Sequence, residues 1–272
     1  MSTPETVPVR VERDGVVTTV TLDNPAARNA CTGDMWVTLG EIFRRVGHSG
    51  ARVVILTGAG GHFCAGADLS GLAGGAPTDG GADGGAGTHL LHAMRVLGEA
   101  MAAVHRCTVP VIAKVDGDCV GAGLGLALAA DVLWCSDRAR FSAIFARRGL
   151  SLDFGTSWLL RQRVGVHLAK QMAFTAELID ATRARDHYRF VNEVVSADDL
   201  DPAVADLAAT IAAGPPLALS MTKRQLDLAG GGSLEQALEL ETLSQNVNVT
   251  TSDMQEAFRA FVEKRPATFE GR

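Results

Sequence analysis

Alternating apolar and polar residues predict a β-hairpin near the start of the chain. The alternation has a period of two over residues 7–12 and 16–22, on either side of Asp14-Gly15. An Asp-Gly dipeptide between two such runs is typical of a tight hairpin turn. Two apolar runs, 53–56 and 110–115, are short and rich in β-branched residues, and they predict buried strands. Weaker strand patterns cover 132–135, 140–142 and 190–195.

Apolar residues spaced three and four positions apart predict helices in the rest of the chain. The first, 32–46, ends at a glycine cluster, and the second, 89–105, follows Thr88 as a capping residue. Ser233, with Gln236 three residues later, has the pattern of a capping box. Further helices are expected over 124–130, 156–164, 166–174, 202–213, 216–229, 233–247 and 252–262.

Both buried strands run into a segment of small residues, 58–69 after the first strand and 116–123 after the second. Such segments offer backbone N–H groups that a ligand can approach closely, because no bulky side chain stands in the way. Ligands of α/β domains bind beyond the strand ends, so the two segments could direct two N–H groups at one developing oxyanion. A plain tight turn is the alternative for either segment taken alone.

The composition narrows the class of protein. The chain has 272 residues, 47% of them hydrophobic, which is enough for a sizeable core. A net charge of −6 and the lack of a long basic run argue against nucleic acid as a partner. Five scattered cysteines without a C-x-x-C predict reduced thiols in a cytoplasmic protein. No signal-peptide pattern or bilayer-length apolar stretch is found, so no membrane association is expected. Residues 70–87 are rich in glycine and predict a mobile loop.

Four segments together resemble the crotonase superfamily, the enoyl-CoA hydratase/isomerase family. They are 22–30, 63–69, 115–131 and 258–266, and the resemblance extends over nearly the whole chain. It implies an α/β fold, with a spiral of ββα units over 1–195 and a C-terminal helical trimerisation region over 196–272. It also implies an acyl-CoA substrate, no cofactor apart from the coenzyme A of that substrate, and a homotrimer or dimer of trimers.

The resemblance also assigns roles to particular residues. Members of the family bind the thioester oxygen in an oxyanion hole. The resemblance implies that the backbone N–H groups of Ala67 and Ala122 form this hole here. Ala122 replaces the middle glycine of a family Gly-Gly-Gly run, but an alanine keeps its N–H. Lys264 resembles a lysine that approaches a CoA phosphate, often in a neighbouring subunit; a solvated tail charge is the alternative. The remaining substrate- and CoA-binding positions that it implies are Ala27, Arg28, Ala65, Ala67, Asp68, Leu69, Ser70 and Phe145.

The two glutamates that family hydratases direct at a water molecule are missing, since their positions are Gly125 and Phe145. One carboxylate remains, Asp153, in a stretch reading Gly-Leu-x-x-Asp-x-Gly-x-Ser-Trp. This stretch resembles the ring-epoxide isomerase of phenylacetyl-CoA breakdown, dienoyl-CoA-type isomerases and the chlorobenzoyl-CoA dehalogenase. A carboxylate can act as a base or as a nucleophile. An N-cap for the following helix is the alternative role for Asp153.

We therefore expect an enoyl-CoA isomerase in which Asp153 moves a proton and the N–H groups of Ala67 and Ala122 hold the thioester enolate. Two alternatives stay open: an enoyl-CoA hydratase that uses Asp153 with a second group, and a protein that binds acyl-CoA without turning it over. Dehalogenation is disfavoured, because the dehalogenase histidine and tryptophan correspond to Gly98 and Phe145. No histidine spacing predicts a metal site. Arg189 replaces a family glycine, which predicts a local change of the backbone.

Overall fold

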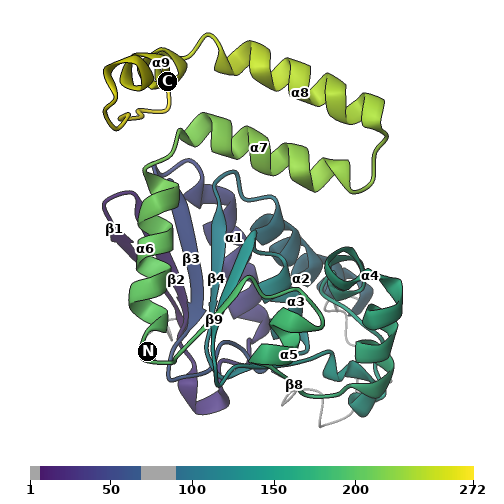
Figure 1. Cartoon of the computed structure of the whole chain (residues 1–272). Helices are drawn as coiled ribbons and strands as arrows, with labels where there is room; N and C mark the ends of the chain where they lie inside the picture. The colour runs from purple at the N-terminus through teal and green to yellow at the C-terminus, as the bar shows by residue number, and fades with distance from the viewer. Residues whose placement is uncertain (1–6, 69–89) are drawn as a thin grey trace, which may run out of the picture.

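The computed structural model describes residues 7–68 and 90–272, and the predicted loop 70–87 lies outside this part (Figure 1). A six-stranded sheet with the order β1-β2-β3-β4-β6-β9 forms its centre. The first pair is the predicted antiparallel hairpin, and every other neighbouring pair is parallel. The strands are β1 (Val9–Asp14), β2 (Val17–Leu22), β3 (Val53–Gly58), β4 (Val111–Val115), β6 (Val132–Ser136) and β9 (Glu193–Val195).

A second sheet of three short strands lies beyond the ends of β3 and β4. It consists of β5 (Asp118–Val120), β7 (Arg140–Ser142) and β8 (Ile179–Asp180). β5 pairs parallel with β7, and β8 pairs antiparallel with β7. Strands of two or three residues are too short to show a period, so the pattern of the sequence predicts only β7 of the three.

Helices cover both faces of the central sheet. Val54 and Leu56 of β3 belong to the larger core, which includes residues of α1 (Gly33–Val46), α2 (Leu90–His105) and α3 (Ala122–Leu128). Val53 and Ile55 point to the opposite face, where they pack against α6 (Leu200–Ala212). The strand is therefore buried on both faces, as its continuous apolar sequence predicts.

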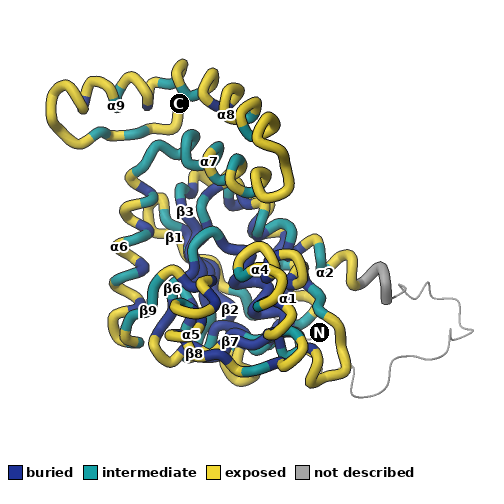
Figure 2. The backbone as a smooth tube through the Cα atoms, turned by 45° about the vertical axis from the view of Figure 1, so that its right-hand side comes forward, coloured by how far each residue is buried: buried dark blue, intermediate teal, exposed yellow. Residues whose placement is uncertain are grey.

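Three helices form an outer layer at one end of the sheet (Figure 1). They are α7 (Pro216–Ala229), α8 (Leu234–Asn248) and α9 (Ser252–Glu263). The predicted capping box is present, because the Ser233 hydroxyl accepts from the Gln236 N–H and the Gln236 side chain accepts from the Ser233 N–H. Figure 2 shows that α8 and α9 are largely exposed, whereas most of α7 is partly buried. In the described part no single helix is both long enough and apolar enough to cross a bilayer. Only α6 and α7 taken together have that length and apolar composition, and a bend of 104° separates them.

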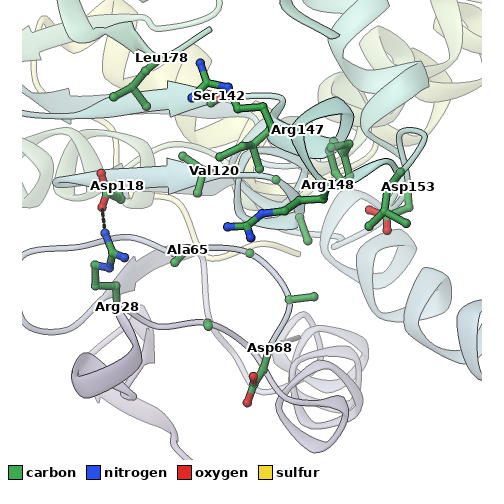
Figure 3. A pocket seen from close by; sticks show the side chains of 18 of the residues that line it. Arg28, Ala65, Asp68, Asp118, Val120, Ser142, Arg147, Arg148, Asp153 and Leu178 are labelled. Carbon is green, nitrogen blue, oxygen red and sulfur yellow. Dashed lines mark hydrogen bonds and ion pairs between the residues drawn. The ribbon is translucent and has the colours of Figure 1, made fainter. Parts of the chain in front are cut away.

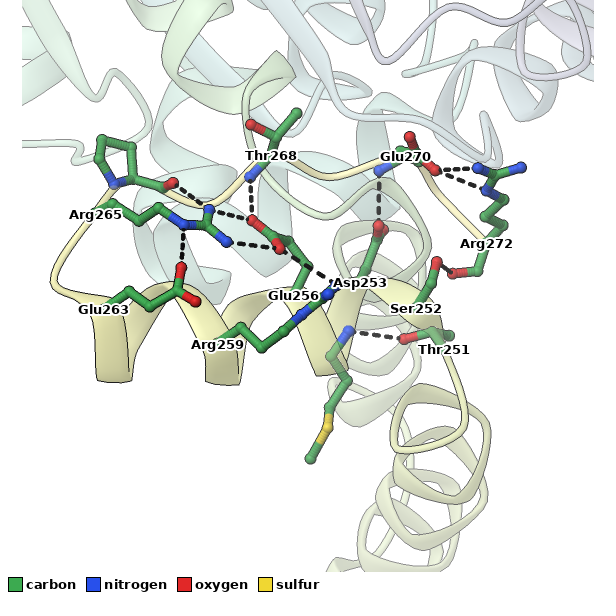
Figure 4. Close-up of polar contacts among 12 residues, drawn as sticks. Thr251, Ser252, Asp253, Glu256, Arg259, Glu263, Arg265, Thr268, Glu270 and Arg272 are labelled. Atoms are coloured by element: carbon green, nitrogen blue, oxygen red, sulfur yellow. Dashed lines mark hydrogen bonds and ion pairs between the residues drawn. The ribbon is translucent and has the colours of Figure 1, made fainter.

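The chain after α9 folds back along that helix (Figure 4). The buried Asp253 carboxylate accepts from the backbone N–H groups of Glu270 and Gly271, at 2.6 and 2.8 Å. Glu256 binds the Arg265 guanidinium through both carboxylate oxygens, and this pairing lowers the pKa of Glu256 to about 2. Two carboxylates of α9 therefore hold the C-terminal segment in place.

The remaining helical segments are η1 (Pro25–Ala27), η3 (Ile144–Arg148), α4 (Thr156–Thr175) and α5 (Ala181–Asp186). α4 comprises the two predicted helices, joined across a bend at Gly165, whose φ is 76°.

Arg189 has a φ of 58°, so this arginine adopts the left-handed conformation that favours glycine. All five cysteines are buried free thiols, which agrees with the predicted absence of disulfides.

Candidate active site

The two small-residue segments lie against each other at the end of the central sheet. Residues 64–68 run between the loop after η1 and strand β5. The Ala65 N–H donates to the Arg28 carbonyl at 2.9 Å, and the Val120 N–H donates to the Cys64 carbonyl at 3.0 Å. Asn29, which is fully buried, fastens the same loop to the turn after β3 by donating to the carbonyls of Ala59 and His62.

This close approach explains the glycines. A Cβ atom on Gly123 would lie 2.3 Å from the Cys64 carbonyl oxygen, so only glycine lets α3 come this near. Gly66 has a φ of 103°, and a Cβ atom there would lie 3.6 Å from the Ala122 nitrogen. The residue before Ala67 therefore lies beside the start of α3, and the structure brings the two predicted oxyanion segments together.

A cavity of about 500 Å³ opens above these segments (Figure 3). Ala122 is the first residue of α3 and follows Gly121 as N-cap, so its N–H has no acceptor within the helix. Among the described residues, no hydrogen bond uses the N–H of Ala67 either. Seven of the residues predicted from the sequence line this cavity: Arg28, Ala65, Ala67, Asp68, Ala122, Phe145 and Asp153.

Asp153 brings a half-buried carboxyl group to the cavity. Its Oδ1 is buried and has no hydrogen-bond partner within the described residues. Burial without a compensating cation raises the pKa of this carboxyl to about 6. The alternative role as helix cap is wrong: Gly155 occupies the N-cap of α4, and no side chain caps that helix end.

The positions of the two missing glutamates differ in their surroundings. Phe145 is buried and lines the cavity. Gly125 is buried behind it, and a Cβ atom there would lie 2.5 Å from the Thr156 hydroxyl and 3.0 Å from the Phe154 carbonyl oxygen. The space that a side chain at position 125 needs is therefore filled by the turn that follows Asp153.

The cavity also contains charged residues that the sequence analysis did not identify. Asp118, whose side chain is 8% exposed, accepts from Arg28 at 3.0 Å and from Arg140 at 2.8 Å. Arg147 and Arg148 of η3 also line the cavity, and no ion pair with them occurs in the described part of the chain. Figure 3 shows Arg148 reaching from η3 into the space above Ala65. The available signal was the position of Asp118 within the second small-residue segment, 116–123.

Two predicted residues, Ala27 and Lys264, do not line the cavity, and two more cannot be placed. Ala27 ends η1 and precedes Arg28. Lys264 is the C-cap of α9, with a φ of 54°, and lies outside this cavity in the single chain, so its contact with a neighbouring subunit's ligand stays a prediction. Leu69 and Ser70 lie outside the described residues. In residues 7–68 and 90–272, no three His, Cys, Asp or Glu side chains are grouped as metal ligands.

Comparison with known proteins identifies the family of this chain. The family model for enoyl-CoA hydratase/isomerase matches residues 12–272. A probable enoyl-CoA hydratase of Rhodobacter capsulatus is 35% identical, over 97% of this chain and 98% of the relative. A 1,2-epoxyphenylacetyl-CoA isomerase of Escherichia coli is 30% identical, over 94% of this chain and 95% of the relative.

A solved structure gives the same result for the fold. The crystal structure of a putative enoyl-CoA hydratase from Streptomyces coelicolor A3(2) superimposes with a TM-score of 0.90 at 34% identity. The match covers 100% of this chain and 97% of that structure. The predicted α/β fold with a C-terminal helical region is thereby confirmed, and the chain belongs to the enoyl-CoA hydratase/isomerase family of the crotonase superfamily.

Proposed function

We propose that this member of the family is an enoyl-CoA isomerase in which Asp153 carries the proton. The observation that carries the proposal is the Asp153 carboxyl, half-buried in the cavity, with its pKa raised to about 6. A base with such a pKa is mostly ionised at neutral pH and still takes up a proton readily. Of the other acidic residues lining the cavity, Asp118 is neutralised by Arg28 and Arg140, and Asp68 also has an interaction partner.

In the proposed reaction, Asp153 removes a proton from the carbon next to the thioester carbonyl. The electron pair of that C–H bond forms an enolate, whose oxygen the N–H groups of Ala67 and Ala122 hold. The protonated carboxyl, whose proton exchanges with solvent, then returns a proton to the α-carbon or delivers one to the γ-carbon, and delivery to the γ-carbon moves the double bond into conjugation with the carbonyl. Loss of one N–H donor to such an oxyanion costs about 3 kcal/mol of transition-state stabilisation. An isomerisation of this kind needs one carboxyl group to carry the proton, and Asp153 takes that role in the proposal.

The second candidate is enoyl-CoA hydration, and the names of the relatives favour it, since most are called hydratases. Hydration needs one group to take a proton from water and a second to deliver one to carbon. Neither Gly125 nor Phe145 supplies a carboxylate, so Asp153 would have to work with another group. The third candidate is a protein that binds acyl-CoA without turnover, which the loss of both glutamates favours.

A panel of CoA thioesters distinguishes the three. The wild-type protein is incubated with β,γ-enoyl-, α,β-enoyl-, dienoyl-, aryl- and 1,2-epoxyphenylacetyl-CoA, and each product is identified by its mass and retention time. We expect a product of unchanged mass but changed double-bond position. A mass gain of one water would establish hydration instead. Tight CoA binding with no product from any thioester would identify a binding protein.

A further inference from the structure

Asp118 joins two arginines that come from different parts of the chain. It is the first residue of β5, and the parallel pairing with β7 places it directly beside Arg140. Its Oδ1 accepts from Arg140 and its Oδ2 accepts from Arg28, so each carboxylate oxygen holds one guanidinium. In Figure 3 the Arg28–Asp118 pair and Asp153 lie on opposite sides of the cavity.

The backbone fixes this carboxylate firmly. The Asp118 carbonyl accepts from the N–H groups of Phe63 and Cys64, and the Asp118 N–H donates to Nδ1 of His62 at 3.2 Å. The same Nδ1 of His62 lies 3.5 Å from an Asp118 carboxylate oxygen. The two arginines donate to that carboxylate and are its permanently charged partners.

Both arginines keep donors for a ligand. A guanidinium has five N–H groups, and the contact with Asp118 uses one nitrogen of Arg28 and one of Arg140. Their side chains are 62% and 51% exposed, and both residues line the cavity. The three groups together carry one net positive charge, and guanidinium donors are well suited to binding a phosphate group.

We propose that Asp118 is a positioning residue that holds Arg28 and Arg140 as a paired site for a phosphate group of the ligand. The inference rests on the proposed function, since the phosphates are those of an acyl-CoA. Exposed arginines lose side-chain freedom when they bind, at a cost in affinity that prior ordering removes. Asp118 imposes this order before the ligand arrives.

Removal of the Asp118 carboxylate has opposite expected effects on phosphate affinity, depending on whether charge or positioning decides. Asp118→Asn raises the local charge by one, and a phosphate should then bind more tightly if charge alone decides. If Asp118 acts by positioning, the same substitution frees two arginines and weakens binding. The sign of the change in affinity therefore decides between the two accounts.

The experiment measures dissociation constants of CoA, 3′-dephospho-CoA and pantetheine for wild type and Asp118→Asn by calorimetry. We expect the Kd of CoA to rise about tenfold in the variant, as the release of two ordered side chains predicts. The Kd of pantetheine, which has no phosphate, should stay the same within twofold. If dephospho-CoA also loses about tenfold, the arginines hold the pyrophosphate; if it does not, they hold the 3′-phosphate.

Asp116→Asn is the matched control. Asp116 lies in the turn just before β5 and also binds an arginine, Arg138, but it does not line the cavity. Its replacement should leave the Kd of CoA unchanged. In a chain carrying Arg28→Gln and Arg140→Gln, Asp118→Asn should have no further effect on that Kd. If Asp118→Asn does not fold, Arg140→Gln alone, which leaves the carboxylate on Arg28, should still weaken CoA binding.

The outcomes separate this inference from the proposed function. Unchanged or tighter CoA binding by a folded Asp118→Asn overturns the positioning role and leaves the isomerase proposal intact. A wild-type protein that binds no CoA would overturn the proposed function itself. An equal loss for pantetheine and CoA would show a general structural defect and would also overturn the positioning role.

Discussion

Burial of the Asp153 carboxyl makes the stability of the protein depend on pH. Its pKa is about 6 in the folded state and about 3.9 in an unfolded chain, so between these values the folded state binds more protons. Stability therefore falls as pH rises from about 4 through 6. The full shift corresponds to about 3 kcal/mol at neutral pH, and solvent screening of this half-exposed carboxyl lowers the contribution to the free energy of unfolding below that value.

Asp153→Asn removes this penalty, because an amide has no proton to lose. We expect the variant to be more stable than wild type by about 2 kcal/mol at pH 7.5 and equally stable near pH 4. Urea unfolding at the two pH values measures the difference. Asp206→Asn on the exposed side of α6 should show no such pH-dependent gain. A destabilised Asp153→Asn at pH 7.5 would contradict the burial effect.

Gly125 shows how far the sequence predicts the site. The missing glutamate is visible in the sequence, but the filling of its space by Thr156 and Phe154 is not, because the turn that places them lies thirty residues away along the chain. Asp118 and Arg140 were missed for the same reason: neighbouring strands bring them together. Ala67, Ala122 and Asp153 were found through family motifs, and their roles stay predictions.

Gly125→Ala tests the crowding directly. The new methyl group would lie 2.5 Å from the Thr156 hydroxyl, so we expect a loss of about 1–3 kcal/mol of stability from overpacking. Gly98→Ala in α2 is the control, since a Cβ atom there meets nothing within 4 Å and alanine favours the helix. Thermal unfolding of both variants gives the result. A Gly125→Ala protein as stable as Gly98→Ala would show that the turn after Asp153 moves away from the new methyl group at little cost in free energy.

At the scale of elements, periodicity predicted the long helices and the buried strands well. It missed β5, β8 and α5, which are three, two and six residues long, and only 193–195 of the predicted strand 190–195 pairs with the sheet. Short elements carry too few residues to show a period, and their neighbours in space decide their form. The predicted division at residue 195 also stays a prediction, although α6 packs on the central sheet rather than with α7 to α9.

The segment after α9 depends on one buried carboxylate. Asp253→Ala removes the acceptor of the Glu270 and Gly271 N–H groups, so both amides should exchange with solvent deuterium much faster. Hydrogen exchange read by mass spectrometry on C-terminal peptides measures this. The Thr268 N–H, which donates to Glu256, should keep its protection and serves as an internal reference. Unchanged exchange at 270–271 would mean that other contacts hold the segment.

For the whole molecule, the outer helices suggest self-association. Large apolar side chains are exposed on α7, α8 and α9, and we expect them to be covered by further copies in a trimer or a dimer of trimers. The most exposed are Leu226, Leu234, Phe258, Phe261 and Val262, with 72%, 70%, 64%, 82% and 63% exposure. The oligomer stays a prediction that the single chain does not test.

Sedimentation velocity at micromolar concentration should therefore give a mass of three or six chains for the wild type. Phe261→Asp should lower that mass, because a charge would be buried in the interface. Phe174→Asp is the control, since Phe174 is 75% exposed and belongs to the last turn of α4, not to the outer helices. A monomeric wild type, or a loss of mass in both variants alike, would contradict this assembly.

The most direct test of the central claim follows the proton itself. Wild type and Asp153→Asn are incubated with a β,γ-enoyl-CoA in D₂O, and deuterium at the α-carbon is measured by NMR together with product formation. We expect wild type to form the α,β-isomer and Asp153→Asn to lose both isomerisation and α-exchange by roughly 10²–10⁴-fold, the usual contribution of a general base. Isomerisation at the wild-type rate by a folded Asp153→Asn protein would contradict the assignment of Asp153 as the proton carrier.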